Sequence, residues 1–189
     1  MVFIRPIQST DWQGLYEIIN QVDKTLVGMY ASTRELVEDW INTIEDGIWE
    51  VHVAILPSME VQKTRKQFRK KLLPWKRPKR NRSRIVGVVT LYGDWKTEED
   101  IEEGDFDIGI TVEEPFQRKG IGKELLCFII NRGLQYNYKR ATLWTREDNL
   151  PMIKLAKKSG FKVDGKRKRH GYNWIQYVME LKKEKEEKN

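Results

Sequence analysis

The strongest constraint on the fold comes from residues 105–126, DFDIGITVEEPFQRKGIGKELL, where a strand pattern runs directly into a glycine turn and then a helix pattern. Apolar residues alternate with polar or small residues over 105–112, which is typical of a half-buried strand. A helical spacing of apolar residues starts at Ile121 and continues to Ile130. The turn between these two core elements is therefore expected to face a ligand or a neighbouring segment.

The turn has the composition of an anion-binding site. Gly120 and Gly122 let the backbone approach a ligand closely, and the N–H groups and positive dipole end of a helix start favour phosphate. Formal positive charge is added by Arg118, Lys119 and Lys123. A glycine turn can also start a buried helix without any ligand, and this segment alone leaves that alternative open.

Two well-known glycine turns do not fit. A Walker loop requires Ser or Thr after Gly-Lys, where this chain has Glu124. A Rossmann turn requires a third glycine where this chain has Leu125. The pattern Q-x-x-G-x-G over 117–122, placed directly after a strand, instead resembles the pyrophosphate-binding motif of the GNAT superfamily of acyl-CoA N-acyltransferases.

A second block strengthens the resemblance. Residues 149–161, NLPMIKLAKKSGF, look like the family's N-x-x-x-I-x-L-x-x-K-x-G-F helix, and they follow a strand pattern at 141–145. Asn149 suits the helix start and Gly160 suits its end, so an ordinary amphipathic core helix would carry the same signals. The resemblance covers most of the chain apart from an insert at 57–83.

The resemblance implies an α/β fold with a single GNAT-type domain, in which helices flank a central, mixed and mostly antiparallel sheet. We expect this domain to span 1–181 and the charged tail 182–189 to be disordered. In the family, the connection at 27–32 lies beside the acceptor pocket. The hydrophobic patterns agree with this fold, because they predict helices at 11–22 and 33–44 and strands at 1–7, 49–56 and 84–92.

The basic insert at 57–83 lengthens the hairpin between the second and third strands. Twelve basic and no acidic residues lie between Lys63 and Arg84, which leaves 23 basic against 28 acidic residues elsewhere. Such a segment could attract nucleic acid, a ribosome or an acidic protein, with Phe68 and Trp75 available to stack on bases. Two alternatives are a basic amphipathic helix that binds a membrane surface or a protein groove, and a solvent-exposed hairpin extension without a partner.

Composition narrows the protein class further. No apolar run approaches the ~20 residues that span a bilayer, and no secretory signal is recognisable, so we expect a cytoplasmic protein. Cys127 is the one cysteine, which rules out an internal disulfide, and its apolar neighbours predict a place in the core. One cysteine and two histidines do not suggest a zinc cluster, so no metal is expected.

The resemblance also implies a co-substrate and the residues that hold it. Acetyl-CoA would lie with its pantetheine arm against the backbone of Ile110, Thr111 and Val112, and the Val112 N–H is a candidate oxyanion donor. Asn149 matches a family position that contacts CoA or orders a water. The pyrophosphate would be held by Gln117, Arg118, Lys119, Gly120, Ile121, Gly122 and Lys123.

The first candidate for the general base is Asp107. It matches the strand position where many relatives carry a glutamate, and its shorter side chain predicts an intervening water. Asp105 and Glu113 are weaker candidates. Trp144 stands where ribosomal-protein alanine acetyltransferases place a glutamate base, which puts that specific assignment in doubt.

The general acid departs from the family pattern as well. Ala156 occupies the position where the family often has a tyrosine acid. Tyr172 is the first substitute, with Ser159 and Tyr177 as alternatives. CoA could also leave unaided, since a thiol of pKa about 8.5 is a tolerable leaving group.

The predicted activity is acetyl-CoA-dependent acetylation of an amine, with a protein N-terminus or lysine as acceptor. A small amine such as a polyamine is the alternative, because a helix carries acidic residues at Glu35, Glu38 and Asp39. A non-catalytic CoA-binding or nucleic-acid-binding module is the further alternative, motivated by Ala156 and the insert. A homodimer is left open.

Overall fold

A computed structural model describes residues 2–21, 33–45, 47–57, 84–93 and 101–181. Three segments that the sequence singles out fall outside the described residues. They are the acceptor-side connection at 27–32, the basic insert apart from Pro57, and the tail at 182–189. No helix in the described ranges is both long and apolar enough to cross a membrane.

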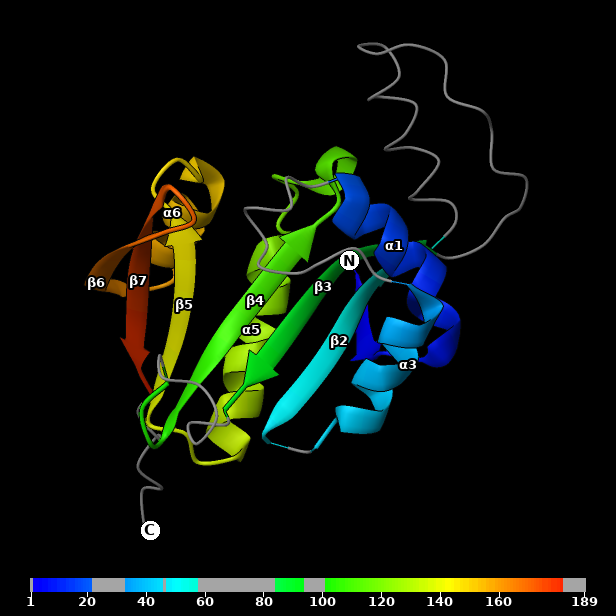
Figure 1. Ribbon diagram of the computed structural model, residues 1–189, viewed down its shortest axis with the longest axis horizontal. Coiled ribbons are helices and arrows are strands. Elements are labelled where there is room, and N and C mark those ends of the chain that lie inside the picture. Colours follow the sequence, from blue (N-terminus) through cyan, green and yellow to red (C-terminus); the bar gives the residue numbers. More distant parts are fainter. Residues whose placement is uncertain (1, 22–32, 46, 58–83, 94–100, 182–189) are drawn as a thin grey trace, which may run out of the picture. The chain divides into compact units, whose positions relative to one another are not determined.

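The described residues contain both strands and helices, and hydrogen bonding joins the strands in the order β1-β2-β3-β4-β5-β7-β6 (Figure 1). The pair β4–β5 is parallel, whereas β1–β2, β5–β7 and β6–β7 are antiparallel. This arrangement confirms the predicted α/β fold with a mixed, mostly antiparallel sheet. The elements are β1 (Phe3–Pro6), η1 (Ser9–Asp11), α1 (Trp12–Gln21), α3 (Arg34–Thr43), β2 (Trp49–Leu56), β3 (Arg84–Tyr92), β4 (Asp105–Val112), η2 (Glu114–Phe116), α5 (Ile121–Gln135), β5 (Arg140–Arg146), α6 (Leu150–Lys158), β6 (Lys162–Arg169) and β7 (Tyr172–Glu180).

The chain divides into two compact units. The first comprises residues 1–44, 51–89 and 110–125, and the second comprises 45–50, 90–109 and 126–189. The core of the first unit forms where α1 meets β3. Leu15 and Ile18 are fully buried, and a Cβ on Gly14 would lie only 3.1 Å from Ile85. That close approach explains why the helix has a glycine at this position.

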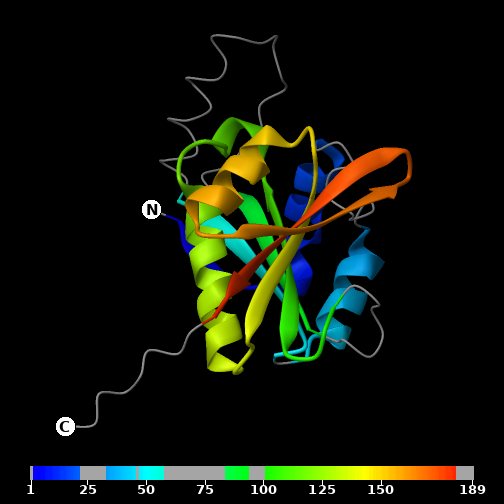
Figure 2. The same cartoon turned by 90° about the vertical axis from the view of Figure 1, so that its left-hand side faces the viewer.

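In the second unit, helices cover one face of the sheet. A Cβ on Gly133 of α5 would lie 2.2 Å from the Phe106 ring on β4, so the helix packs directly on the strand. Ala156 of α6 is fully buried, and so are Leu143 on β5 and Tyr177 on β7. Figure 1 shows β5, β7 and β6 side by side, with β6 at the edge, and Figure 2 views the same strands from that edge. The other face of these strands carries polar residues.

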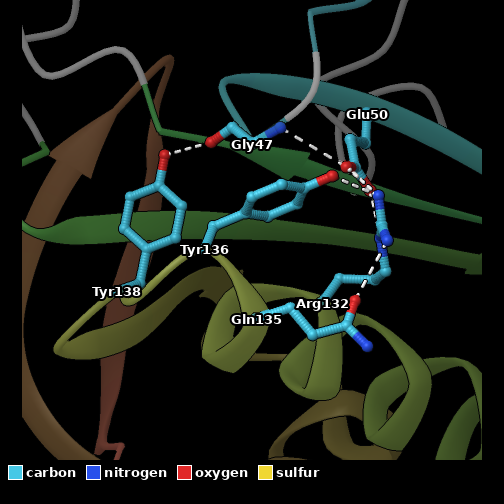
Figure 3. A network of polar contacts seen from close by, with 6 residues as sticks. All are labelled: Gly47, Glu50, Arg132, Gln135, Tyr136 and Tyr138. Atoms are coloured by element: carbon cyan, nitrogen blue, oxygen red, sulfur yellow. Dashed lines mark hydrogen bonds and ion pairs between the residues drawn. The ribbon is translucent and has the colours of Figure 1, made fainter.

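A buried ion pair joins the start of β2 to the end of α5 within the second unit (Figure 3). Arg132 Nε donates to Glu50 Oε2 at 2.9 Å and Nη2 donates to Oε1 at 2.6 Å, while the Glu50 side chain is only 2 % exposed. The Arg132 guanidinium also donates to the Tyr136 hydroxyl, and the Tyr138 hydroxyl donates to the Gly47 carbonyl. These bonds hold the turn before β2 against the helix.

Cys127 corrects one expectation, because its side chain is exposed rather than packed in the core. Leu125, Leu126 and Ile129 are the fully buried residues of this part of α5. With 100° between successive helix residues, the position that follows Leu126 points away from the buried stripe. The apolar neighbours in sequence were therefore poor guides to the burial of this cysteine.

Candidate active site

The glycine turn lies in the first unit and has the backbone geometry of an anion-binding helix start. Gly120 has φ +87° and Arg118 has φ +58°, so both adopt the left-handed conformation. The Glu124 N–H donates to the Gly120 carbonyl at 3.0 Å, which is the first intrahelical bond of α5. The N–H groups of the first helical turn, which begins at Ile121, precede that ladder and are available to a ligand.

The side chains of the turn leave its surface open. Gln117, Arg118, Lys119 and Lys123 are exposed. A Cβ placed on Gly120 would meet nothing within 4 Å. The turn therefore combines exposed cations with an uncovered glycine backbone. Buried Phe116 anchors its start, and the Lys119 ammonium lies 5.9 Å from the Phe116 ring.

The end of β4 directs two N–H groups away from its neighbour β3. The Glu113 N–H donates to the Val86 carbonyl on β3 at 2.9 Å. Because successive residues of a strand point their N–H groups to opposite edges, those of Val112 and Ile110 point to the other edge. The Gln117 side-chain amide donates to the Val112 carbonyl at 2.9 Å, on that same edge.

Thr111 differs from its neighbours, because its backbone carbonyl lies on the β3 side, 3.1 Å from the position of a Cβ on Gly87. Its side-chain hydroxyl is buried and has no hydrogen-bond partner among the described residues. The Thr111 backbone is therefore turned toward β3, away from the edge that Ile110 and Val112 present, which the strand pattern in the sequence did not indicate.

Glu113 is held by an ion pair rather than exposed to a substrate. Arg84 Nε donates to Glu113 Oε2 at 2.9 Å, and the same guanidinium lies 3.2 Å from a carboxylate oxygen of Glu17 on α1. Burial raises the pKa of the Glu113 carboxyl, although Arg84 opposes the shift. This arrangement favours a structural role for Glu113 at the end of β4.

The raised pKa of Glu113 predicts a pH effect on stability. Between the ordinary glutamate pKa and the raised value, the folded state binds the proton more tightly than the unfolded state, so the free energy of unfolding falls as pH rises. Wild type is therefore expected to lose stability relative to Glu113→Gln across this interval. Urea unfolding of both proteins over a pH series measures the difference, and a constant difference contradicts the shift.

The second unit holds Asp107, which is half-buried on β4. The Thr142 hydroxyl on β5 lies 3.0 Å from Asp107 Oδ1 and 3.3 Å from the Phe106 carbonyl. A donated hydrogen bond from this buried hydroxyl fixes the carboxylate orientation. Asp105, the weaker base candidate on the same strand, instead accepts two hydrogen bonds from Arg140, at 2.9 and 2.6 Å.

Asn149 is the N-cap of α6, as its sequence position indicated. Its side-chain oxygen accepts a hydrogen bond from the Met152 N–H at 3.3 Å, and the half-buried side chain leaves part of its surface accessible. Capping explains why Asn is favoured here. A contact with CoA would be an additional role.

Tyr172 lies at the start of β7, and the Arg146 guanidinium sits 3.8 Å above its ring. The structure does not bring Tyr172 next to Asp107. Asp107 pairs with Thr142 and Thr142 pairs with Val178, which is six residues from Tyr172 along β7, or about 20 Å. Of the alternatives, Tyr177 is buried in the helix-covered core and Ser159 is the C-cap of α6.

A second arginine-aromatic stack was missed by the sequence reasoning. The Arg167 guanidinium on β6 lies 3.9 Å from the Trp144 ring on β5. The run KRKR at 166–169 was the available signal, although its partners depend on strand pairing.

Comparison with known proteins decides the family. The family model of the acetyltransferase (GNAT) family matches residues 41–161, which include both motif blocks. The chain belongs to the GNAT acetyltransferase family. It is thus an acyl-CoA N-acyltransferase by family, with acetyl-CoA as co-substrate. No curated protein sequence matches the chain.

Solved structures share the GNAT fold at low sequence identity. An N-acetyltransferase from Staphylococcus aureus Mu50 superposes with a TM-score of 0.69 at 18 % identity, covering 96 % of this chain and 99 % of its own. YncA of Salmonella typhimurium, solved with acetyl-CoA, gives 0.70 at 16 % identity, covering 97 % and 96 %. The ribosomal-protein-S18-alanine N-acetyltransferase of Escherichia coli gives 0.62 at 14 % identity, covering 100 % and 99 %.

The role of the glycine turn of this GNAT protein in binding acetyl-CoA can be tested by adding a single Cβ atom. Gly120→Ala is expected to weaken acetyl-CoA binding about tenfold, because a Cβ at φ +87° costs roughly 1 kcal/mol or more and shifts the adjacent N–H groups. Titration with acetyl-CoA measures the affinity. Gly171→Ala is the matched control, since Gly171 has φ +81° and equally open surroundings. An equal loss in both variants would contradict a role of the turn in binding.

Proposed function

We propose that this protein transfers the acetyl group of acetyl-CoA to an amine of another protein, at its N-terminus or at a lysine. The observation that carries the proposal is the pairing of Asp107 with the Thr142 hydroxyl, three residues before the strand end assigned to the co-substrate. A fixed carboxylate in that position can accept a proton from an amine, directly or through one water.

The co-substrate contacts follow from the first unit. Backbone N–H groups at the start of α5, with Gln117, Arg118, Lys119 and Lys123 around them, are assigned to the pyrophosphate. Ile110 and Val112 offer N–H groups on the edge away from β3, and Thr111 between them stays part of the predicted pantetheine-binding strand. These contacts of the first unit would orient the thioester. Asn149 in the second unit stays a predicted contact with CoA.

The reaction forms a bond between the amine nitrogen and the thioester carbon and breaks the carbon–sulfur bond. Asp107 removes the amine proton, and the Val112 N–H stabilises the negative charge on the carbonyl oxygen. An α-amino group has a pKa of about 7.7–8 against about 10.4 for lysine, so an N-terminus needs less help from the base. Because Tyr172 lies about 20 Å from Asp107 along the strands, CoA is expected to leave unaided, as a thiol of pKa about 8.5 allows, and Tyr172→Phe should retain activity.

The protein acceptor is favoured over a polyamine by the structure of α3. Among the described side chains of α3, Glu38 accepts a hydrogen bond from Arg34 at 2.8 Å, so this carboxylate already has a cationic partner. Hydrogen bonding to its own backbone and to Thr33 lowers the pKa of Glu35, as expected at a helix start. The Escherichia coli structural neighbour is named for acetylating an alanine of a ribosomal protein.

The remaining sequence predictions stay part of the proposal. The domain limits at 1–181 and a cytoplasmic location are expected on the same sequence grounds as before, and a homodimer stays open. The insert at 57–83 is predicted to attract nucleic acid, a ribosome or an acidic protein. Deleting 59–82 should abolish that attraction and spare acetylation of small amines.

The experiment is acetyl-CoA turnover, read as free thiol, with a panel of amines. The panel contains N-terminal peptides without lysine, lysine peptides with blocked N-termini, and polyamines. Turnover on a peptide supports the proposal and identifies the amine. Turnover on polyamines alone would move the function to small-molecule metabolism, and CoA binding without any turnover would favour the non-catalytic module.

A further inference from the structure

The sheet face that carries Asp107 in the second unit also carries arginine and aromatic side chains. Strand pairing determines this, because directly paired residues and every second residue along a strand project on the same side. We call this set the Asp107 face. It consists of Asp107, Thr142, Trp144, Arg146, Arg167, Arg169, Tyr172, Trp174 and Gln176.

Contacts between these side chains hold the cations in place. Arg167 lies 3.9 Å from the Trp144 ring, and Arg146 lies 3.8 Å from the Tyr172 ring. A guanidinium stacked by its flat side keeps its in-plane N–H donors directed sideways, which suits planar recognition of a carboxylate. In contrast to the helix-covered side, Trp144, Trp174 and Gln176 are only half-buried. The face is thus accessible as well as ordered.

Positive charge dominates this face beyond Asp107. Arg146 is paired with Asp148 through a hydrogen bond of 2.9 Å. The face also carries Arg167 and exposed Arg169. Lys162 pairs with Val178 and adds another cation at the β6 edge. Among the described strand residues that pair directly on this side, Asp105 and Glu180 are carboxylates, at the opposite end of β5 from Arg146.

The distances suit an extended peptide. Trp144 is two residues from Thr142, the partner of Asp107, which corresponds to about 7 Å along the strand. Because the Arg167 guanidinium lies against the Trp144 ring, it is about one or two residue lengths farther from Asp107 than Trp144 is. A peptide rises about 3.3 Å per residue, so an amine at Asp107 places its fourth and fifth residues beside Arg167, and a glutamate side chain at position three also reaches in that direction.

We propose that the acceptor is a peptide with acidic residues shortly after the reactive amine, and that Arg167 on the Asp107 face selects it. This inference rests on the proposed function, since it assumes that Asp107 receives the amine. Arg167 pairs with a carboxylate of the acceptor, while the surrounding cations repel basic segments. Polyamines are disfavoured for the same reason.

The test compares two peptides that differ only in Glu against Gln at positions three to five, each with one free α-amine. Wild type is expected to favour the Glu peptide about tenfold in kcat/KM, a ratio typical of one charge-assisted pair. Arg167→Glu should reduce that ratio to one or below. Lys168→Glu is the matched control with the same charge change on the opposite side of β6, and it should keep the preference.

The ratio is measured within each variant, so a loss of overall activity does not affect it. A wild-type ratio near or below one overturns the inference, as does an equal drop in Lys168→Glu, which would indicate net charge alone. Absence of turnover with every peptide contradicts the proposed function instead. In that case, the affinities of the two peptides are compared in the presence of CoA. Tighter binding of the Glu peptide to wild type supports the inference, and equal binding overturns it.

Discussion

Replacing Asp107 with Asn is expected to lower kcat/KM for the acceptor amine by two to four orders of magnitude. Asn has the shape of Asp and can still accept the hydrogen bond from Thr142, so the variant removes basicity while keeping the packing. Acetyl-CoA binding should be unchanged, because the glycine turn is untouched. Initial rates of thiol release at saturating acetyl-CoA, over a range of amine concentrations, measure the effect.

Asp107→Glu provides the companion variant. It keeps the carboxylate and matches the residue that many relatives are expected to carry at this position, so it should retain far more activity than Asn. Comparable activity of wild type and Asp107→Asn across the pH range would remove Asp107 from the mechanism. Rates that fall equally in both variants would assign it a packing role.

Replacing Arg132 with Met is expected to destabilise the protein by about 3–5 kcal/mol, because Glu50 would be left buried without its cation. The Glu50 side chain is 2 % exposed and accepts two hydrogen bonds from this guanidinium (Figure 3). For a chain of this length, the change corresponds to a fall in Tm of roughly 10 °C. Urea unfolding and thermal melting measure the two quantities.

Arg34→Met is the matched control, since Arg34 also donates to a glutamate but is 64 % exposed. An exposed pair four residues apart on a helix is screened by solvent and contributes little to stability. A large loss in Arg34→Met, or a negligible one in Arg132→Met, would contradict the assignment of stability to burial of Glu50. Acetyl-CoA affinity at low temperature should be preserved in both variants.

The sequence was sufficient to predict the elements whose patterns are local. The bounds of β2 and β3 agree with the predicted 49–56 and 84–92, because the first has an alternating pattern that ends at Pro57 and the second is a nearly continuous apolar run that ends at Gly93. The glycine turn was likewise predictable, since the residues that need a left-handed backbone lie next to a strong strand and helix pattern. Strand β6 was not delimited, because its residues are mainly basic and its place depends on pairing with β7.

The candidate site also has parts that the sequence predicted and parts that it did not. Asp107 and the 117–123 turn were found from sequence, whereas the Thr142 bond to Asp107 links positions 35 residues apart and required the β4–β5 register. The Arg167 stack on Trp144 required two further strand pairings. Periodicity specifies which residues share a face of one strand, but not which strands become neighbours.

Acetyl transfer to a protein amine is tested by following both products of one reaction. Wild-type protein, acetyl-CoA and a peptide with a single free amine are incubated, free thiol is quantified, and the peptide is analysed by mass spectrometry. We predict that thiol appears only when the amine is present, in an amount equal to the peptide acetylated on its nitrogen. Thiol release without acetylated peptide, or no release with any amine while acetyl-CoA is bound, would contradict acetyl transfer to a protein amine.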